Sequence, residues 1–486
     1  MFFFNVFPRL RLKVLFFLSL LSGVWDIQLD AADQSQWGEA WSRNMVSSEK
    51  KLPDSFDPKS GLNLKWSAKL GTETYSTPII AAGRIYIGTN NGEPRDPKQT
   101  GDRGVLMCFE EKSGRFLWQL LVAKREEDPY LDWPNTGISS PVTVENDRVY
   151  LVSNRGEVLC LNAPDGKIIW CFDLTTGAGI WSHDAAHSSI LIHDSYLYLN
   201  TGTGVDNTHK RIRAPKAPSL VVIDKENGQL VARDDEQIAP NIFHSTWSSP
   251  SLGKVNGRNL IFFAGGNGIV YAFAPVEIKN QKAKTNGVAP VARLKKIWQF
   301  NFDTTAPAGD VHQYLSNRRE GPSNIYGMPV FNKNRVYVAG GGDVFWGKNQ
   351  AWLKCIDATK TGDITTNGLV WSYPLEKHVL STPAVYDGSV FIADCGRTMH
   401  CVDAETGQPF WTHELKGDVW ASPLVADGKV YLGTRSGALW IFAASREKKI
   451  LATIETGNPI NATATAANGV VYIATMNRLY AISQKK

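Results

Sequence analysis

The chain has 486 residues, of which 43% are apolar and 11% aromatic, and it contains 42 glycines. This composition is ample for a large core and for the turns of an all-β repeat fold. The formal net charge is only +5, and the sequence has no run of Lys and Arg and no recognisable nucleic-acid-binding module. A nucleic-acid partner is therefore not expected.

Residues 1–32 have the pattern of a secretory signal. Basic residues precede an apolar run at 14–24 that is too short to span a bilayer, and Ala31-Ala32 offers small residues for cleavage. The first cysteine is Cys108, so the cysteine box that directs lipid attachment is missing. We expect an exported protein, periplasmic or extracellular, with no lipid anchor and no transmembrane segment after cleavage; an uncleaved anchor is the alternative.

After the leader, one pattern recurs eight times along the chain. It consists of a Ser/Thr-x-Pro start, an apolar strand, a turn rich in Asp, Asn and Gly, a Val-Tyr-Val-Gly strand, a third strand, and an outer strand that usually carries Trp. The clearest copies begin at Tyr75-Ser76-Thr77-Pro78, Ile138-Ser139-Ser140-Pro141, Trp247-Ser248-Ser249-Pro250, Leu380-Ser381-Thr382-Pro383 and Trp420-Ala421-Ser422-Pro423. Looser copies begin at His187, Tyr326 and Asn461. A four-strand unit of about 40 residues, repeated this often, predicts a β-propeller.

The barest copy shows how the unit divides into strands. We expect strands at 424–426, 429–433, 437–442 and 450–454, with Asp427-Gly428 as the tight turn between the first two. Outer strands carry Trp118, Trp170 and Trp411 at the same offset from a turn glycine, whereas Trp298 and Trp371 end longer connections. A large flat ring at one position per blade fits the wedge-shaped gap between neighbouring blades.

The two ends of the repeat region predict how the ring closes. The chain ends in a third strand at 478–482 with no fourth strand after it, while residues 64–68 form an outer strand without a blade. Pairing them completes one blade and removes two exposed sheet edges. We therefore expect an all-β, eight-bladed β-propeller of four-stranded antiparallel blades over 62–486, with an N-terminal extension at 33–61.

The six cysteines do not form a disulfide framework in this interpretation. Four of them occupy one equivalent place in the third strand, just before a turn, where a small buried hydrophobe fits: Cys108, Cys160, Cys355 and Cys401. We expect them to be free and packed. The spacing of the cysteines also lacks any CxxC-type metal motif.

The combined motifs resemble the repeat of the quinoprotein (PQQ-like) propellers. They are similar in particular to the secreted bacterial PQQ-like repeat proteins that are likened to BamB, and the segments 204–209 and 214–219 resemble a stretch shared within that group. The resemblance covers about 37–482 and implies the propeller fold. It implies less about activity, because this fold carries both quinone-dependent dehydrogenases and scaffolds.

Most of the extra length of the repeats falls in loops on one face, namely the loops between the second and third strands and those between blades. Long loops at one end of a rigid scaffold are the usual place for binding or catalysis. In blades 3–5 these loops hold the candidate binding residues: Trp181, His183, Asp184, Asp206, Asn207, His209, His244, Trp247, Asp310, Arg318, Asp343 and Trp346. We expect His209 and His244 to lie in exposed loops. Such residues can bind a metal, exchange protons or clamp a planar acidic ligand. The alternative is that they only hold the loops together.

Two classes of function follow from the resemblance. A scaffold or binding module needs no cofactor and would meet a protein or glycan outside the cytoplasm, as a monomer. A quinone-dependent alcohol or sugar dehydrogenase would bind PQQ with Ca²⁺ in the central funnel, and an Asp would take the alcohol proton. The vicinal Cys pair of many such enzymes is absent, and no calcium-binding set or catalytic residue can be assigned. We expect the binding module, and we keep the dehydrogenase, and a metal-dependent hydrolase, as alternatives.

Overall fold

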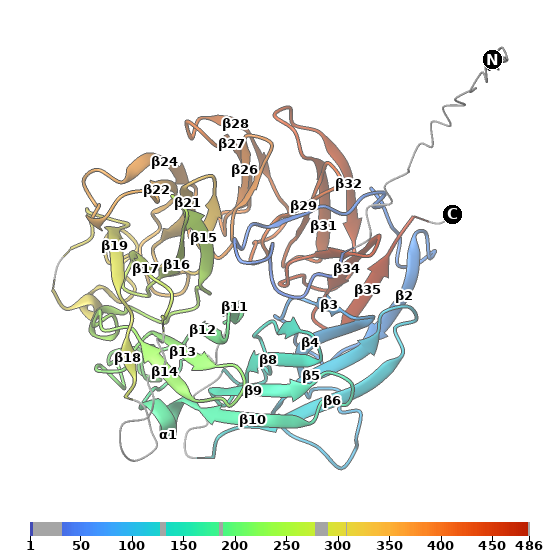
Figure 1. The fold of residues 1–486 in the computed structure, drawn as a ribbon, viewed down its shortest axis with the longest axis horizontal. Helices are drawn as coiled ribbons and strands as arrows, with labels where there is room; N and C mark the ends of the chain where they lie inside the picture. Colours follow the sequence, from blue (N-terminus) through green and yellow to red (C-terminus); the bar gives the residue numbers. More distant parts are fainter. Residues whose placement is uncertain (3–31, 127–132, 184–187, 278–289, 308, 485–486) are drawn as a thin grey trace.

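The computed structural model describes residues 1–2, 32–126, 133–183, 188–277, 290–307 and 309–484. These residues form eight antiparallel sheets in a ring around a central channel (Figure 1). The prediction of an all-β, eight-bladed propeller is confirmed. The expected secretory signal at 1–32 lies outside the described residues except at its two ends. No helix in the described part of the chain has the length and apolar character to cross a membrane.

The strands of the first four blades follow one another along the chain. Blade 1 consists of β3 (Ile79–Ala81), β4 (Arg84–Asn90), β5 (Arg103–Glu110) and β6 (Phe116–Ala123), and blade 2 of β7 (Thr143–Glu145), β8 (Arg148–Val152), β9 (Glu157–Asn162) and β10 (Ile168–Asp173). Blade 3 consists of β11 (Leu191–His193), β12 (Tyr196–Asn200), β13 (Leu220–Asp224) and β14 (Leu230–Arg233), and blade 4 of β15 (Ser251–Val255), β16 (Arg258–Ala264), β17 (Ile269–Phe273) and β19 (Lys296–Asn301).

The second half of the ring has the same organisation. Blade 5 consists of β20 (Val330–Asn332), β21 (Arg335–Gly341), β22 (Ala351–Asp357) and β24 (Leu369–Leu375), and blade 6 of β25 (Ala384–Tyr386), β26 (Ser389–Ala393), β27 (Thr398–Asp403) and β28 (Pro409–Glu414). Blade 7 consists of β29 (Leu424–Ala426), β30 (Lys429–Gly433), β31 (Ala438–Ala443) and β32 (Ile450–Glu455), and blade 8 of β33 (Thr465–Ala467), β34 (Val470–Ala474), β35 (Arg478–Ile482) and β2 (Leu64–Lys69). The strands expected in the barest copy are found to within one residue.

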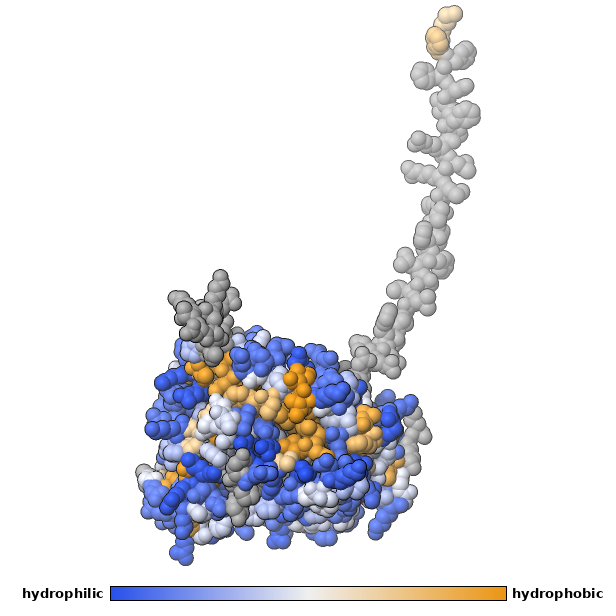
Figure 2. All heavy atoms as spheres, turned by 90° about the horizontal axis from the view of Figure 1, so that it is seen from below, coloured by the Kyte–Doolittle hydropathy of each residue, from blue (hydrophilic) through white to orange (hydrophobic). Residues whose placement is uncertain are grey.

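A few short elements lie outside this repeat. They are β1 (Val46–Ser47), β18 (Ala292–Arg293), β23 (Gly362–Asp363), helix α1 (Leu174–Ala178) and the 3-10 helices η1 (Ala239–Asn241) and η2 (Val311–Tyr314). Strands β18 and β23 pair in parallel with the outer strands β14 and β19, so they cover the edges of blades 3 and 4. Seen edge-on, the rim of the ring carries apolar patches between hydrophilic side chains (Figure 2).

The ring closes through the two ends of the repeat region. Strand β2 pairs antiparallel with β35, with Trp66 opposite Ala481 and Lys69 opposite Arg478. The predicted closure is therefore confirmed. Because one strand of blade 8 comes from the start of the propeller and three come from its end, the ring has no open side.

A tryptophan on the outer strand joins each of six blades to the next one. Its ring nitrogen donates a hydrogen bond to a backbone carbonyl beside the turn between the third and fourth strands of the following blade; Trp118, for example, donates to Ala163 at 3.1 Å. The other five pairs are Trp66 with Glu111, Trp170 with Lys225, Trp298 with Ala358, Trp371 with Ala404, and Trp411 with Ser445. The predicted inter-blade role of these rings is confirmed.

The turn glycine of the repeat is required by the same contact. Gly166 has a φ of 70°, and a Cβ built on it would lie 2.4 Å from the ring of Trp118. Gly407 stands in the same relation to the ring of Trp371, at 2.6 Å. A side chain at either position would therefore both strain the turn and push the ring out of the gap between blades.

The hydroxyl groups of the Ser/Thr-x-Pro motif connect neighbouring blades around the channel. Ser248 donates to the carbonyl of Gly327, and Ser381 donates to the carbonyl of Ala421. The Ser422 hydroxyl accepts a hydrogen bond from the backbone N–H of Thr382. The motif thus joins neighbouring blades near the channel, while the tryptophans join them at the outer strands.

The buried cysteines behave as small hydrophobes. Cys108, Cys160, Cys355 and Cys401 are free and buried, as expected. Burial raises the pKa of the Cys108 thiol and that of the Cys355 thiol to about 12, so both remain protonated at neutral pH.

The N-terminal extension is part of the ring. A segment that we call the strap, residues 33–53, lies against the inner strands around the channel and makes hydrogen bonds to all eight blades. Near its start, Ile80 of blade 1 donates its N–H to the carbonyl of Gln34, and near its end Gly469 of blade 8 donates to the Glu49 carboxylate. Between them, β1 pairs in parallel with β29 of blade 7.

Two buried polar residues fasten the strap. Arg43 is fully buried and donates hydrogen bonds to the carbonyls of Trp37, Ser189 and Pro250, and to the Ser189 hydroxyl. Asn44 pairs through its side-chain amide with both backbone groups of Val385, at 2.8 Å each. The strap also binds turns between first and second strands, so it fills the channel from the short-turn face.

Candidate functional site

A cavity of about 410 Å³ lies in the channel on the side of the long loops. Its size falls within the range of small-molecule binding pockets. Aromatic rings dominate its lining: Trp37, Tyr75, Trp133, Trp247, Tyr326, Phe345, Trp346 and Trp420, together with His209 and His244. Because Trp37 belongs to the strap, the cavity ends against the strap on the short-turn side.

One position within the repeat supplies many of the residues that line this cavity. Six of the residues that directly precede a Ser/Thr-x-Pro start line the cavity: Tyr75, Trp247, Tyr326, Leu380, Trp420 and Asn461. Of the other two, Ile138 is buried in the core and His187 lies outside the described residues. Three of the cavity aromatics that were missed from the sequence, Tyr75, Tyr326 and Trp420, therefore had a signal in the motif itself. Trp37 had none, because nothing in the sequence places the strap in the channel.

Three histidines from three loops meet at the wall of the cavity. His183 lies between blades 2 and 3, His209 between β12 and β13, and His244 between blades 3 and 4. One ring nitrogen of each lies within 4.8 Å of the other two, and the Nε2 atoms of His183 and His244 are 3.1 Å apart. His183 and His244 are only 5% and 2% exposed because the loops pack on one another, so the prediction that His244 is exposed is wrong.

A buried carboxylate holds one of these histidines. Asp343 accepts a hydrogen bond from His244 Nδ1 at 3.0 Å and another from the Tyr326 hydroxyl. Its second oxygen accepts the backbone N–H groups of Phe345 and Trp346 at 3.0 and 2.6 Å. Burial raises the pKa of Asp343, but the His244 ring and the Tyr326 hydroxyl outweigh burial and leave this pKa below its usual value. Asp343 is therefore ionised at neutral pH, and it fixes the His244 ring with Nε2 facing the other histidines.

Other predicted residues surround this cluster. The ring of Trp346 lies 5.1 Å from that of His209, and the ring of Trp247 lies 5.7 Å from that of His244. Arg318 donates to the carbonyls of Phe345 and Gly347, so it supports the loop that carries Trp346. The structure thus brings six of the twelve candidates together, namely His183, His209, His244, Trp247, Asp343 and Trp346, with Arg318 behind them.

The remaining candidates are not brought to the cluster by any described contact. Asp206 accepts hydrogen bonds from Thr208 and closes its own turn, and Asp310 caps the 3-10 helix η2. The Trp181 ring packs under the Arg213 guanidinium at 3.9 Å. Asn207 is exposed, and Asp184 lies outside the described residues.

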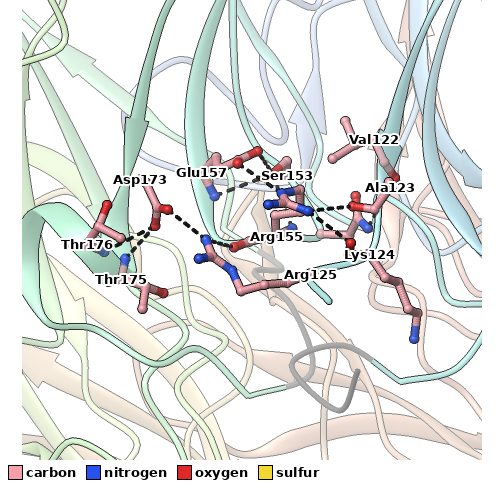
Figure 3. A network of polar contacts seen from close by, with 11 residues as sticks. Val122, Ala123, Lys124, Arg125, Ser153, Arg155, Glu157, Asp173, Thr175 and Thr176 are labelled. Carbon is pink, nitrogen blue, oxygen red and sulfur yellow. Dashed lines mark hydrogen bonds and ion pairs between the residues drawn. The ribbon is translucent and has the colours of Figure 1, made fainter. Parts of the chain in front are cut away.

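A polar network anchors the loops of blades 1 and 2 on the same face (Figure 3). Arg125 forms an ion pair with Asp173 at 2.9 Å and donates to the carbonyl of Arg155. Asp173 also caps α1 by accepting the backbone N–H groups of Thr175 and Thr176. The insertion after β6, which later supplies Trp133 to the cavity, is thereby fixed to blade 2 at its start.

A second buried ion pair joins the loops of blades 4 and 5. The carboxylate of Asp303 accepts the Lys348 ammonium and the Ser323 hydroxyl, and both members of the ion pair are almost fully buried. Burial raises the pKa of Asp303, but hydrogen bonds from Lys348, Thr305 and Ser323 lower it to about 2.

We expect this ion pair to stabilise the fold above the ordinary carboxyl pKa and to lose its effect in acid. The folded-state pKa of Asp303 is depressed, so the contribution is complete above about pH 4 and falls as the pH drops toward 2. Urea unfolding of the wild type and Asp303→Asn should show a stability gap at pH 5 that narrows by pH 2.5. A gap that stayed constant over this range would show that the ionisation of Asp303 contributes nothing.

The cavity does not fit a quinone held together with Ca²⁺. Ca²⁺ takes six to eight oxygen ligands, chiefly carboxylates and carbonyls. Among the described residues that line the cavity there is no Asp or Glu, and the nearby Asp343 is fully buried with its oxygens directed at His244, Tyr326 and two backbone N–H groups. The lining is therefore suited to apolar rings rather than to a hard cation.

Comparison with known proteins places the chain in a family. The family described as outer membrane protein assembly factor BamB matches residues 102–277 and 349–486, which is more than half of the sequence. The chain belongs to this family. A curated relative, the outer membrane protein assembly factor BamB of Yersinia pestis, is 21% identical over 325 residues, which cover 63% of this chain and 71% of the relative.

Solved structures of a BamB and of a dehydrogenase both have this fold. BamB from Moraxella catarrhalis has a TM-score of 0.55 and 13% identity, covering 87% of this chain and 97% of its own. A europium-containing methanol dehydrogenase has a TM-score of 0.61 and 11% identity, covering 93% and 98%. At these identities the likeness establishes the propeller fold alone.

Proposed function

We propose that this protein is an exported binding module of the BamB family, and that the long-loop face of blades 3–5 takes an apolar, ring-bearing side chain of a protein partner into the central cavity. The observation that carries the proposal is the cavity itself. It combines aromatic walls with a position at the mouth of a rigid ring, where a bound group loses water on all sides. Buried aromatic anchors of this kind supply most of the binding energy of protein interfaces.

The chemistry of the lining favours a protein partner over a glycan. The described lining exposes mostly apolar surface, and its one arginine, Arg435, stacks on the ring of Trp420 at 3.8 Å. A glycan brings many hydroxyl groups, and each one buried without a hydrogen-bond partner costs about 1–3 kcal/mol. The relative named as an outer membrane protein assembly factor supports a partner protein outside the cytoplasm, and the leader pattern of residues 1–32 supports export. A closed ring without open sheet edges fits action as a monomer.

The quinone-dependent dehydrogenase receives no support from a particular observation. The likeness to methanol dehydrogenase extends to the fold, and the described lining lacks the carboxylates that are the chief ligands of Ca²⁺. Binding without a resident quinone is therefore the function that the cavity supports best.

The test is a calorimetric titration of the mature protein with a blocked peptide that contains one tryptophan, and in parallel with a chitin oligosaccharide. We expect the peptide to bind and Trp346→Ala to weaken it by about 10–30-fold, since truncating an aromatic anchor at an interface costs about 2 kcal/mol. The matched control is Trp41→Ala, because Trp41 lies in the strap and is as exposed as Trp346, at 36% and 37%. It should bind like the wild type.

Three other results would contradict this proposal. Binding of the oligosaccharide alone would make the partner a glycan. Peptide binding that is unchanged in Trp346→Ala would place the binding surface elsewhere. No binding of either probe would remove the binding role of the cavity.

A further inference from the structure

We propose that His183, His209 and His244 form a transition-metal site at the wall of the cavity, suited to Zn²⁺. The three rings come from separate loops, and their centroids are only 4.9 to 5.2 Å apart. Three loops of different lengths bring three imidazoles to one point. This site does not depend on the protein-partner proposal, and its test below uses the ion alone.

The distances match shared coordination. Two imidazole nitrogens bound to one tetrahedral Zn²⁺ at about 2.0–2.1 Å lie about 3.3 Å apart. The Nε2 atoms of His183 and His244 are 3.1 Å apart, and a His209 nitrogen lies within 4.8 Å of both. His183 and His244 are therefore already at the spacing of two ligands, and a rotation of the His209 side chain brings the third.

A hydrogen-bonded carboxylate prepares His244 for this role. Asp343 is ionised and accepts Nδ1–H of His244, which leaves the lone pair on Nε2 and directs it to the cluster. Metal-ligating histidines usually donate their second ring N–H to a carboxylate, because this fixes the tautomer and raises the basicity of the ligand nitrogen. Tyr326 and two backbone N–H groups hold the Asp343 carboxylate in turn.

The backbone around the other two histidines is also constrained. His183 donates its N–H to the carbonyl of Gly202 and accepts the Ser245 hydroxyl at its own carbonyl. His209 has a left-handed backbone with a φ of 59°, which is uncommon for a residue with a side chain. Its ring packs on that of Trp346. The loops thus fix the backbone that carries these rings before any ion arrives.

The ligand set selects the class of ion. Neutral imidazoles suit Zn²⁺, Cu²⁺ and related first-row ions, and they do not suit Ca²⁺ or Mg²⁺, which take oxygen ligands. Three histidines leave one position of a tetrahedral Zn²⁺ to an outside ligand. His209 and His244 line the cavity, so an ion held by the three histidines would lie at the cavity wall.

Blade 6 offers a matched control for the site. His400 is as buried as His244, donates from Nε2 to the Asp394 carboxylate at 3.0 Å and contacts the Tyr373 hydroxyl at 3.1 Å. It therefore also has an Asp and a Tyr as partners, but no metal-ligating group that includes it is found among the described residues. Its replacement measures the structural cost of removing such a histidine.

The experiment uses the mature protein without a histidine tag, dialysed against a chelator and titrated with Zn²⁺ in competition with a chromophoric chelator. We expect one Zn²⁺ per chain. His209→Gln should bind at least about 10-fold more weakly, and His400→Gln should bind like the wild type. Co²⁺ should give the visible absorption of a tetrahedral nitrogen site in the wild type and lose it in His209→Gln. His183→Gln serves as a second ligand variant.

Each outcome of the Zn²⁺ titration either supports or overturns the metal site. The proposal is overturned if the wild type binds no Zn²⁺ at micromolar concentrations, since the histidines are then joined only by hydrogen bonds. It is also overturned if His209→Gln and His183→Gln, folded by circular dichroism, bind as well as the wild type. Zn²⁺ binding together with no peptide binding would leave the metal site standing and remove the protein-partner proposal.

Discussion

Replacing Trp298 by alanine is expected to lower the free energy of unfolding by about 3–5 kcal/mol, as for other buried tryptophans that leave a cavity. Trp298 is fully buried between blades 4 and 5. Its ring packs 5.8 Å from that of Phe262, and its nitrogen donates to the carbonyl of Ala358. The loss therefore combines an empty wedge between two blades with an unpaired carbonyl. Urea unfolding followed by circular dichroism measures it.

Trp298→Phe is the matched variant, because it keeps a ring in the gap and removes only the hydrogen bond and part of the volume. It should cost clearly less than the alanine variant. If both variants had the stability of the wild type, the outer-strand tryptophans would not hold the blades together.

Replacing Arg43 by methionine is expected to cost a similar amount, about 3–5 kcal/mol, and to release the strap. The guanidinium makes four hydrogen bonds from a fully buried position, and methionine fills its space while leaving three backbone carbonyls unpaired. Burial lowers the pKa of Arg43 to about 9, which still keeps it charged at neutral pH. Limited chymotrypsin digestion should then cut at Trp37 and Trp41 while the ring stays intact.

The control is Arg115→Met, which removes an exposed arginine paired with Glu110 and should change stability by less than about 1 kcal/mol. A strap that remained protected from digestion in Arg43→Met would show that Asn44 and the backbone pairing of β1 hold it without Arg43. Since Trp37 lines the cavity, release of the strap should also weaken peptide binding in the titration described above.

The sequence alone determined the architecture of this protein. The number of blades, the closure of the ring by β2 and β35, and the inter-blade position of Trp118 and Trp411 all follow from a pattern with a fixed period, which the structure confirms. Such features are visible in sequence because each blade is built mainly from neighbouring segments, and every copy meets the same packing problem with the same residue types.

Only the tertiary structure determined which of the loop residues come together to form a site. The loop residues could be named from their composition, yet six of them converge while Asp206 and Asp310 stabilise their own loops. His183 and His244 are buried rather than exposed, because their surroundings come from loops of other blades.

The position of the strap is the clearest feature that the sequence did not predict. It is held in the channel largely through backbone carbonyls and the side chain of Arg43, whose partners lie 146 and 207 residues away in sequence. Hydrogen bonds to backbone carbonyls cannot be predicted from residue types. Insertions of irregular length show no repeating pattern. The repeat therefore specifies the ring by itself, whereas the contents of its channel depend on contacts that exist only after the ring has closed.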